Sequence, residues 1–239
     1  MKSNKQRYIK HIEKIKLIHE TPEIYWCKET QEYVDNDVSN PSKQWIRDII
    51  SEQKEQDCVR HRDKDFVLLP DIKNIYRRCL YLHGSMLHFN WMGIVTDPCL
   101  RSIRDLRKQH IPLLKHIKAT GIECIRKEFP QVRTEDIMVY ANYPPSVHVL
   151  HFHFCFPFFH ASAYDAFRVH AIDHIINNLE VNADYYSMST FVVPVHETSP
   201  LIKIYGATCY SEDSSSESSD DLIRMDKQLD TVDYNRLET

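Results

Sequence analysis

The 239-residue sequence predicts an α+β fold that is built on an antiparallel sheet. Strand-length apolar runs come first in the order of elements, and then a helical stretch, two more strands and a second helical stretch. The most apolar run, residues 147–156, is expected to form the central strand. Hydrophobic residues make up 42% of the chain and charged residues 27%, a composition typical of globular proteins that bury a core.

The N-terminal region is predicted to be an arm followed by a linker. Residues 7–19 place apolar side chains at helical spacing and predict an amphipathic helix. Residues 20–43 are polar and rich in turn-forming residues, and we expect a connector there. Ser42 is expected to cap a helix over 43–54 that carries Trp45 on its apolar side.

The next elements predict the first half of the sheet. Residues 57–59 and 66–69 flank the charged turn 61–65 and are typical of a β-hairpin. Residues 89–95 are expected to form a strand that ends at Thr96-Asp97-Pro98, and residues 109–129 repeat apolar side chains at helical spacing.

The C-terminal half continues with strands over 137–140 and 147–156, a helix over 162–179 and a strand over 191–195. After Ile204 the composition turns to serine and acidic residues, which predicts a disordered tail.

Charge and cysteine usage exclude several function classes. The net charge is −4, but five acids and no base lie between Ser211 and Asp221, so the rest of the chain is close to neutral. Long nucleic acid is therefore not an expected partner. The seven cysteines form no CxxC pair, which favours a reducing compartment, and no apolar run is long enough to span a bilayer. We expect a protein of the cytoplasm and nucleus.

The chemistry is expected in the strand over 147–156. Alternate residues of a strand share a face, so His151 and His153 point one way and His148 the other. Two imidazoles in an apolar strand need partners, because a buried polar group without one costs about 1–3 kcal/mol.

Three interpretations of this pair compete. Both rings are core histidines bonded to backbone, or they form half of a metal site, or one ring is a nucleophile while the other donates to a phosphate. The sequence singles out no third metal ligand, and we expect neither a metal nor a cofactor.

The string His151-Phe152-His153-Phe154 resembles the histidine-triad signature His-φ-His-φ-His-φ-φ, where φ is apolar. The chain over residues 7–204 is similar to the scavenger mRNA-decapping enzymes. The similar strings, in order, are Asp65-Phe-Val-Leu-Leu-Pro-Asp-Ile-Lys73, Leu100-Arg-Ser-Ile-Arg-Asp-Leu106, His110-Ile-Pro-Leu-Leu114, Asn177-Asn-Leu-Glu180 and Pro200-Leu-Ile-Lys203. The resemblance implies an N-terminal arm over 1–41, a histidine-triad domain with two main helices over 42–205, and a tail over 206–239.

This resemblance implies hydrolysis of residual m7GpppN caps to m7GMP and a nucleoside diphosphate, on a cap dinucleotide or a short capped oligonucleotide, by a homodimer. His151 holds the central triad position, where the family's histidine forms a covalent nucleotidyl intermediate, and His153 holds the third. The first position falls on Val149, whose backbone carbonyl can still orient the nucleophile.

The resemblance also assigns the substrate-binding residues. Trp45 matches the aromatic residue that stacks on the cationic methylated base, a contact worth about 1–2 kcal/mol. Glu55 matches the acid that accepts from the guanine edge. Asp71, Ile72 and Lys73 fall on the segment next to the ribose and phosphates. Taken singly, such residues are more often ordinary core or surface residues. Only their joint match to the family, in the family's order, favours a substrate-binding site.

The remaining residues fall on the phosphate side. Ser146 matches a phosphate-contacting serine and Arg168 an arginine near the phosphates, whereas Asn142 stands where the family has a histidine and Val147 where it usually has a tyrosine. These departures leave an alternative open: a catalytically weakened cap-binding or regulatory paralogue.

The family's full-length members carry an N-terminal domain that closes over the cap as a lid. Residues 7–41 resemble the segment that leads into this domain, and we expect most of the lid to be absent from this chain. We therefore expect slow turnover. A general nucleotide hydrolase of the histidine-triad superfamily is a third possibility, against which the pair of Trp45 and Glu55 argues. Residues 77–88 are an insertion without a physical account.

Overall fold

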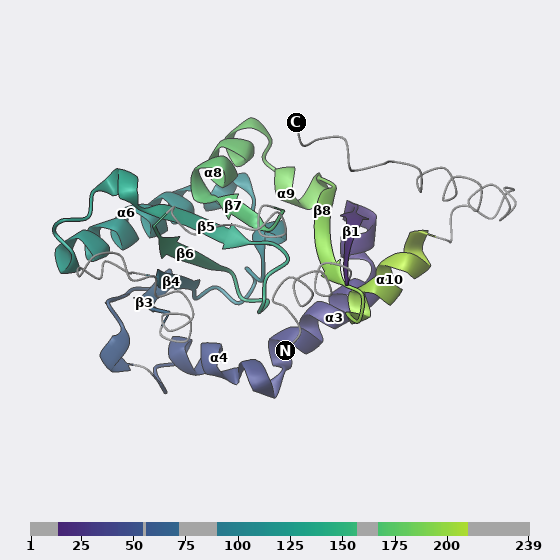
Figure 1. Cartoon of the computed structure of the whole chain (residues 1–239), viewed down its shortest axis with the longest axis horizontal. Coiled ribbons are helices and arrows are strands. Elements are labelled where there is room, and N and C mark those ends of the chain that lie inside the picture. Colours follow the sequence, from purple (N-terminus) through teal and green to yellow (C-terminus); the bar gives the residue numbers. More distant parts are fainter. Residues whose placement is uncertain (1–13, 55, 72–89, 157–166, 210–239) are drawn as a thin grey trace, which may run out of the picture.

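The computed structural model describes residues 14–54, 56–71, 90–156 and 167–209, and they form an α+β fold around a six-stranded antiparallel sheet. The strand order is β2-β3-β4-β6-β5-β7, and a second sheet pairs β1 with β8 (Figure 1). The predicted fold class is confirmed. Among the described residues, no helix combines the length and the apolar character needed to cross a bilayer.

The two central strands are β4 and β6, and the apolar run over 147–156 predicted the central position of β6. Ile94 of β4 lies opposite His151 of β6, and Met92 lies opposite His153. The strands of this sheet are β2 (His61–Arg62), β3 (Phe66–Pro70), β4 (Asn90–Val95), β5 (Met138–Asn142), β6 (His151–Cys155) and β7 (Val169–Ala171).

Helices α6 (Ile111–Glu128) and α8 (Ile172–Val181) cover one face of this sheet (Figure 1). The main core lies between them and the sheet, and it contains the fully buried rings of Phe152 and Phe154. Gly121 of α6 lies directly against the Phe154 ring, where an added Cβ would overlap it. Only glycine therefore lets this helix approach the sheet so closely.

The opposite face packs on helix α4 (Gln44–Ile50) through a smaller apolar cluster. Arg62 of β2 donates to the carbonyl oxygens of Ile49 and Ile50 at 2.8 and 2.9 Å. These bonds satisfy carbonyls at the end of α4 and fasten the helix to the hairpin. The cluster consists of Ile46, Ile49, Val67, Leu69, Met92, Ile94 and Val147.

The described part of the N-terminal region, from residue 14 onward, belongs to the folded body. Strand β1 (Ile15–Glu20) pairs antiparallel with β8 (Phe191–His196). Glu20 is buried and accepts from Arg104, Nη2 to Oε1 at 2.6 Å, and also from Tyr143 and Tyr205. Arg104 thus belongs to a buried structural ion-pair network.

The remaining elements are short helices that surround these two sheets. The α-helices are α2 (Pro22–Trp26), α3 (Lys28–Ser39), α9 (Tyr185–Met188) and α10 (Pro200–Cys209). The 3₁₀-helices are η1 (Pro41–Lys43), η2 (Gln56–Cys58), η3 (Ile103–Asp105), η4 (Lys108–His110) and η5 (Thr134–Asp136).

Several predictions for the N-terminal half were wrong. Residues 15–20 form a strand and not part of a helix, because they pair with β8. Residues 20–43 contain two α-helices and a 3₁₀-helix rather than a connector. The first is capped by Thr21, whose Oγ1 accepts from the Ile24 amide at 3.3 Å. The first hairpin arm lies at 61–62 and not at 57–59. Helix α4 ends four residues before the predicted 54.

Several predictions for the C-terminal half were also wrong, in part because of strand pairing. Residues 169–171 pair with β5, so the helix expected over 162–179 begins only at Ile172 in the described part. Strand β6 begins at His151 and not at residue 147. Helix α10 continues through Cys209, so residues 206–209 are not disordered. The rest of the predicted tail and the insertion at 77–88 lie outside the described residues, and the domain limits at 41 and 205 stay predictions.

Candidate active site

His151 and His153 lie on the face of the sheet that packs on helix α4. Their cross-strand partners Ile94 and Met92 belong to the apolar cluster beneath that helix, and cross-strand partners point to the same face. The two imidazole centroids are 5.2 Å apart with the rings nearly perpendicular. The predicted juxtaposition of the two rings is confirmed.

His151 is held in one defined tautomer. Its Nδ1 lies 2.7 Å from the carbonyl oxygen of Val149, and a carbonyl can only accept, so Nδ1 carries the proton. Burial lowers the pKa of His151 below its ordinary value, against the opposing effect of this hydrogen bond. A neutral ring protonated at Nδ1 has its lone pair on Nε2, which is the state an imidazole needs to act as a nucleophile.

His153 is half-buried and stacks on Tyr140 of β5, with centroids 5.1 Å apart and the planes 24° from parallel. The stack fixes the plane of its ring beside His151. An imidazole held at this distance from a nucleophile can donate to an oxygen of the group under attack.

The loop before β6 departs from the predicted strand and turns His148 toward helix α3. Nδ1 of His148 lies 2.7 Å from Oδ2 of Asp37, and its backbone amide donates to the same oxygen at 3.1 Å. Asp37 also pairs with Lys43. Burial opposes ionisation of Asp37, but the bonds from His148 and Lys43 outweigh it and lower the pKa of Asp37 to about 2. His148 is therefore engaged away from the first triad position.

The predicted phosphate-side residues lie around this same loop. Ser146 is exposed, and its carbonyl accepts from Nζ of Lys43 at 2.6 Å. Asn142 ends β5 opposite Val169, and Arg168 donates to the Pro144 carbonyl at 2.9 Å. Arg168 thus supports the segment that leads to Ser146 and His151.

Trp45 extends from the start of α4 and is half-buried against the apolar cluster beneath that helix. It therefore lies on the histidine-bearing side of the sheet. The indole is neither a fully buried core residue nor a free surface residue, which fits a side chain that can accept a planar ligand.

Asp71 follows β3, and its amide donates to the Asn90 carbonyl at 2.7 Å. Nδ2 of Asn90 donates to Oδ2 of Asp71 at 3.3 Å, whereas the buried Oδ1 of Asn90 is the one buried side-chain oxygen or nitrogen without a hydrogen-bond partner in the described part of the chain. The sequence prediction missed Asn90, although a polar residue two positions before Met92 in an apolar strand was a usable signal. Glu55, Ile72 and Lys73 lie outside the described residues.

Residues 44–166, more than half of the chain, match the family model described as "Scavenger mRNA decapping enzyme C-term binding". The chain belongs to the scavenger mRNA-decapping enzyme family. The match begins at α4 and extends past β6, so it contains Trp45, Asp71 and the two histidines of β6. In this member of the family, Val149 occupies the predicted first triad position, and its backbone carbonyl orients a neutral His151.

Curated relatives agree with this membership. The chain is 31% identical over 206 residues to the m7GpppX diphosphatase of Rattus norvegicus, covering 82% of this chain and 57% of that protein. It is 29% identical over 205 residues to the m7GpppX diphosphatase of Ascaris suum, covering 81% and 64%. The chain therefore spans less than two thirds of the length of these relatives. Among solved structures, Hnt3 in complex with DNA and guanosine aligns with a TM-score of 0.37 at 16% identity, covering 70% of this chain and 94% of that chain.

Proposed function

We propose that this chain hydrolyses m7GpppN cap structures to m7GMP and a nucleoside diphosphate, with His151 as the nucleophile. The observation that carries the proposal is the Nδ1–H bond to the Val149 carbonyl, which leaves the lone pair of a buried, neutral imidazole on Nε2. The names of the curated relatives support the substrate class.

In the proposed reaction, Nε2 of His151 attacks the phosphorus next to the methylated guanosine. The bond from that phosphorus to the bridging oxygen breaks, and the nucleoside diphosphate leaves. The imidazole gains positive charge as the nitrogen–phosphorus bond forms, and the Val149 carbonyl at 2.7 Å stabilises that charge. His153 donates to a phosphate oxygen. Water then attacks the phosphorus, the nitrogen–phosphorus bond breaks, and m7GMP is released.

The base would lie against Trp45, whose electron-rich face attracts the positive charge of 7-methylguanine, and Glu55 would accept from the guanine edge. Ser146, Arg168 and Asn142 would contact or support the phosphates from the loop before β6. Asp71, Ile72 and Lys73 would lie beside the ribose and phosphates.

We include Asn90 in the proposed site because its buried Oδ1 has no partner among the described residues and its side chain contacts Asp71. A ribose hydroxyl is a donor that would satisfy this oxygen.

A second candidate function is cap binding without efficient turnover. The observation that favours it is the state of the first triad position, where Val149 supplies only its backbone and His148 is bonded to Asp37. Both candidates share the proposed base-binding residues and differ only in the chemical step.

The test is incubation of the purified chain with m7GpppG, with m7GMP followed by chromatography. Wild type is compared with His151→Asn and with His174→Asn, a matched control at an exposed histidine of α8. Formation of m7GMP by wild type and His174→Asn but not by His151→Asn supports the hydrolase.

Absence of m7GMP from wild type rejects the hydrolase and turns the question to binding. In that case m7GDP is titrated against tryptophan fluorescence, with Trp45→Phe as the reference, because the chain holds three tryptophans. Quenching that is lost in Trp45→Phe supports the cap-binding candidate, and no quenching in wild type rejects both.

The resemblance also supports a homodimer located in the cytoplasm and nucleus. Light scattering coupled to size-exclusion chromatography tests the dimer, and a mass near 28.4 kDa, that of one chain, would contradict it.

A further inference from the structure

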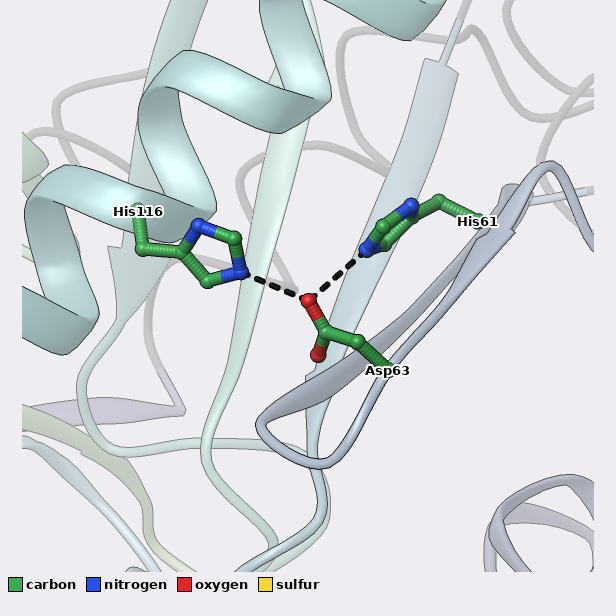
Figure 2. A group of neighbouring side chains, drawn as sticks. All are labelled: His61, Asp63 and His116. Atoms are coloured by element: carbon green, nitrogen blue, oxygen red, sulfur yellow. Dashed lines mark hydrogen bonds and ion pairs between the residues drawn. The ribbon is translucent and has the colours of Figure 1, made fainter.

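Two histidines and an aspartate converge on the side of the central sheet opposite His151. His61 of β2, Asp63 of the following turn and His116 of α6 point toward one another (Figure 2). Oδ2 of Asp63 lies 2.9 Å from Nε2 of His61 and 2.6 Å from Nε2 of His116. Three potential ligand atoms from two separate segments thus meet at one point, and all lie within 4.8 Å of one another.

These ligand types favour a particular kind of ion. Two imidazole nitrogens and one carboxylate oxygen suit Zn²⁺ and similar divalent transition metals rather than Ca²⁺ or Mg²⁺, which prefer oxygen ligands. Zinc–ligand bonds of about 2.0–2.1 Å in a tetrahedron separate the ligand atoms by roughly 3.4 Å. Oδ2 of Asp63 therefore needs to move away from the two nitrogens by less than about 1 Å to admit the ion, and the two nitrogens lie within 4.8 Å of each other.

The side chains leave room for both this movement and a further ligand. Their exposed fractions are 26% for His61, 26% for Asp63 and 40% for His116. Water can therefore reach the cluster and supply a fourth ligand, and partly exposed side chains adjust at little cost.

Neighbouring groups already orient the ligands. Oδ1 of Asp63 accepts from the amides of Asp65 and Phe66 at 2.8 and 3.0 Å, which directs Oδ2 toward the histidines. Nδ1 of His116 lies 3.3 Å from Oγ1 of Thr120. When Nδ1 donates to that hydroxyl, Nε2 presents its lone pair to the ion, and such outer contacts are typical of metal-binding histidines.

The cluster is separate from the active site. His61 lies opposite Leu68 in the β2–β3 ladder, and Leu68 belongs to the core on the α6 side of the sheet. The Phe66 ring packs against both imidazoles, with centroids 5.0 Å from His61 and 5.6 Å from His116. An ion here would tie the hairpin to α6 on the face opposite His151.

We propose that His61, Asp63 and His116 form a structural site for Zn²⁺ or a similar divalent transition-metal ion that links the β2–β3 hairpin to helix α6. The observations that carry it are the convergence of three ligand atoms from two segments and the outer contacts that aim Asp63 and His116. The inference does not depend on the proposed decapping activity.

The test measures metal binding by the full chain after removal of bound metal by a chelator and with its cysteines kept reduced. Zn²⁺ is titrated in competition with a chromophoric chelator. Asp63→Asn keeps the acceptor for the turn amides and removes the carboxylate, and His116→Gln removes one imidazole. His174→Gln on α8 is the matched control for loss of an exposed histidine.

Wild type and His174→Gln are expected to bind one equivalent of Zn²⁺ tightly. Asp63→Asn and His116→Gln are expected to lower the affinity for this Zn²⁺ at least 100-fold, because each removes a ligand. Thr120→Val is expected to lower it about tenfold, because loss of a contact that orients a ligand typically lowers metal affinity about 10- to 100-fold. Zn²⁺ at saturation is expected to raise Tm by about 5 °C in wild type and not in Asp63→Asn.

Co²⁺ provides an independent readout of the ligands. A visible spectrum of four-coordinate Co²⁺ without a thiolate charge-transfer band places the ion on histidine and carboxylate, whereas a thiolate band assigns it to the cysteines and overturns the proposal. Circular dichroism checks that each variant is folded. The proposal is also overturned if wild type binds no Zn²⁺ tightly, or if folded Asp63→Asn and His116→Gln bind Zn²⁺ as tightly as wild type does. The cluster would then be only a hydrogen-bonded His–Asp–His bridge.

Discussion

The two faces of the central sheet are built from the same strands but differ in what they bury. On the α6 side, β6 contributes Phe152 and Phe154, both fully buried in the main core. On the α4 side, the same strand contributes His151 and His153, which lie over a much smaller apolar cluster. The large core supplies most of the apolar burial, so the opposite face can hold polar side chains that stabilise the fold little.

The comparison predicts that substitutions on the two faces separate activity from stability. Loss of a side chain from the α4 side should mainly reduce activity or ligand binding, and loss from the α6 side should mainly reduce the free energy of unfolding.

The largest expected effect is that of His151→Asn. The substitution removes the proposed nucleophile, and turnover of m7GpppG is expected to fall at least about 10,000-fold, with a change in Tm of only a few degrees. Product chromatography and thermal melting measure the two quantities. Retention of more than a tenth of wild-type turnover would remove His151 from the proposed role.

Phe154→Ala is the matching change on the opposite face. A buried phenyl ring against Gly121 is lost, and the free energy of unfolding is expected to fall by about 3–5 kcal/mol, which lowers Tm by about 10 °C. Urea unfolding measures the change, and m7GDP affinity is followed below the melting transition. If Phe154→Ala were as stable as wild type but bound m7GDP more weakly, the assignment of stability to the α6 side and of ligand binding to the α4 side would be contradicted.

Asn90→Ala tests whether the partnerless oxygen belongs to the site. The substitution removes the buried Oδ1 together with one bond to Asp71, so these two effects on stability partly cancel. Affinity for m7GDP is expected to fall about five- to tenfold, as for one lost hydrogen bond. Calorimetric titration measures it, and unchanged affinity would return Asn90 to a purely structural role.

Asp37→Asn tests how the loop before β6 is held in place, and it has the smallest expected effect of these variants. The folded pKa of Asp37, about 2, lies below the ordinary 3.8, so its ionised form stabilises the fold. That contribution is complete above about pH 5 and is lost as the pH falls toward 2. The variant is expected to be about 1 kcal/mol less stable at pH 7.

The pH dependence separates the charge of Asp37 from its packing. Urea unfolding at pH 7 and at pH 3 is expected to show a difference between wild type and Asp37→Asn that shrinks at the lower pH. A constant difference at both pH values would show that the charge contributes nothing to holding His148.

Local periodicity was enough to predict the strand that carries His151 and His153 and the main helix. Strand residues alternate between faces, so His151 and His153 had to share one face once this run formed a strand. Apolar spacing likewise predicted a helix over 109–129, where α6 spans Ile111–Glu128, because side chains three and four residues apart share a helical face. The resemblance to the family added Trp45 and Asp71. Trp45 packs on the α4 side of the sheet, and Asp71 contacts Asn90 at the start of β4.

Long-range pairing decided what local patterns could not. Residues 15–20 form a strand because β8 supplies their hydrogen bonds, and residues 169–171 do so because β5 is beside them. His148 turns away from the site because Asp37, 111 residues earlier, accepts from its ring. His116 meets Asp63 across 53 residues, a convergence that no spacing in the chain indicates. Local sequence determines which side chains share a face of one element, whereas the partners of each face depend on tertiary packing.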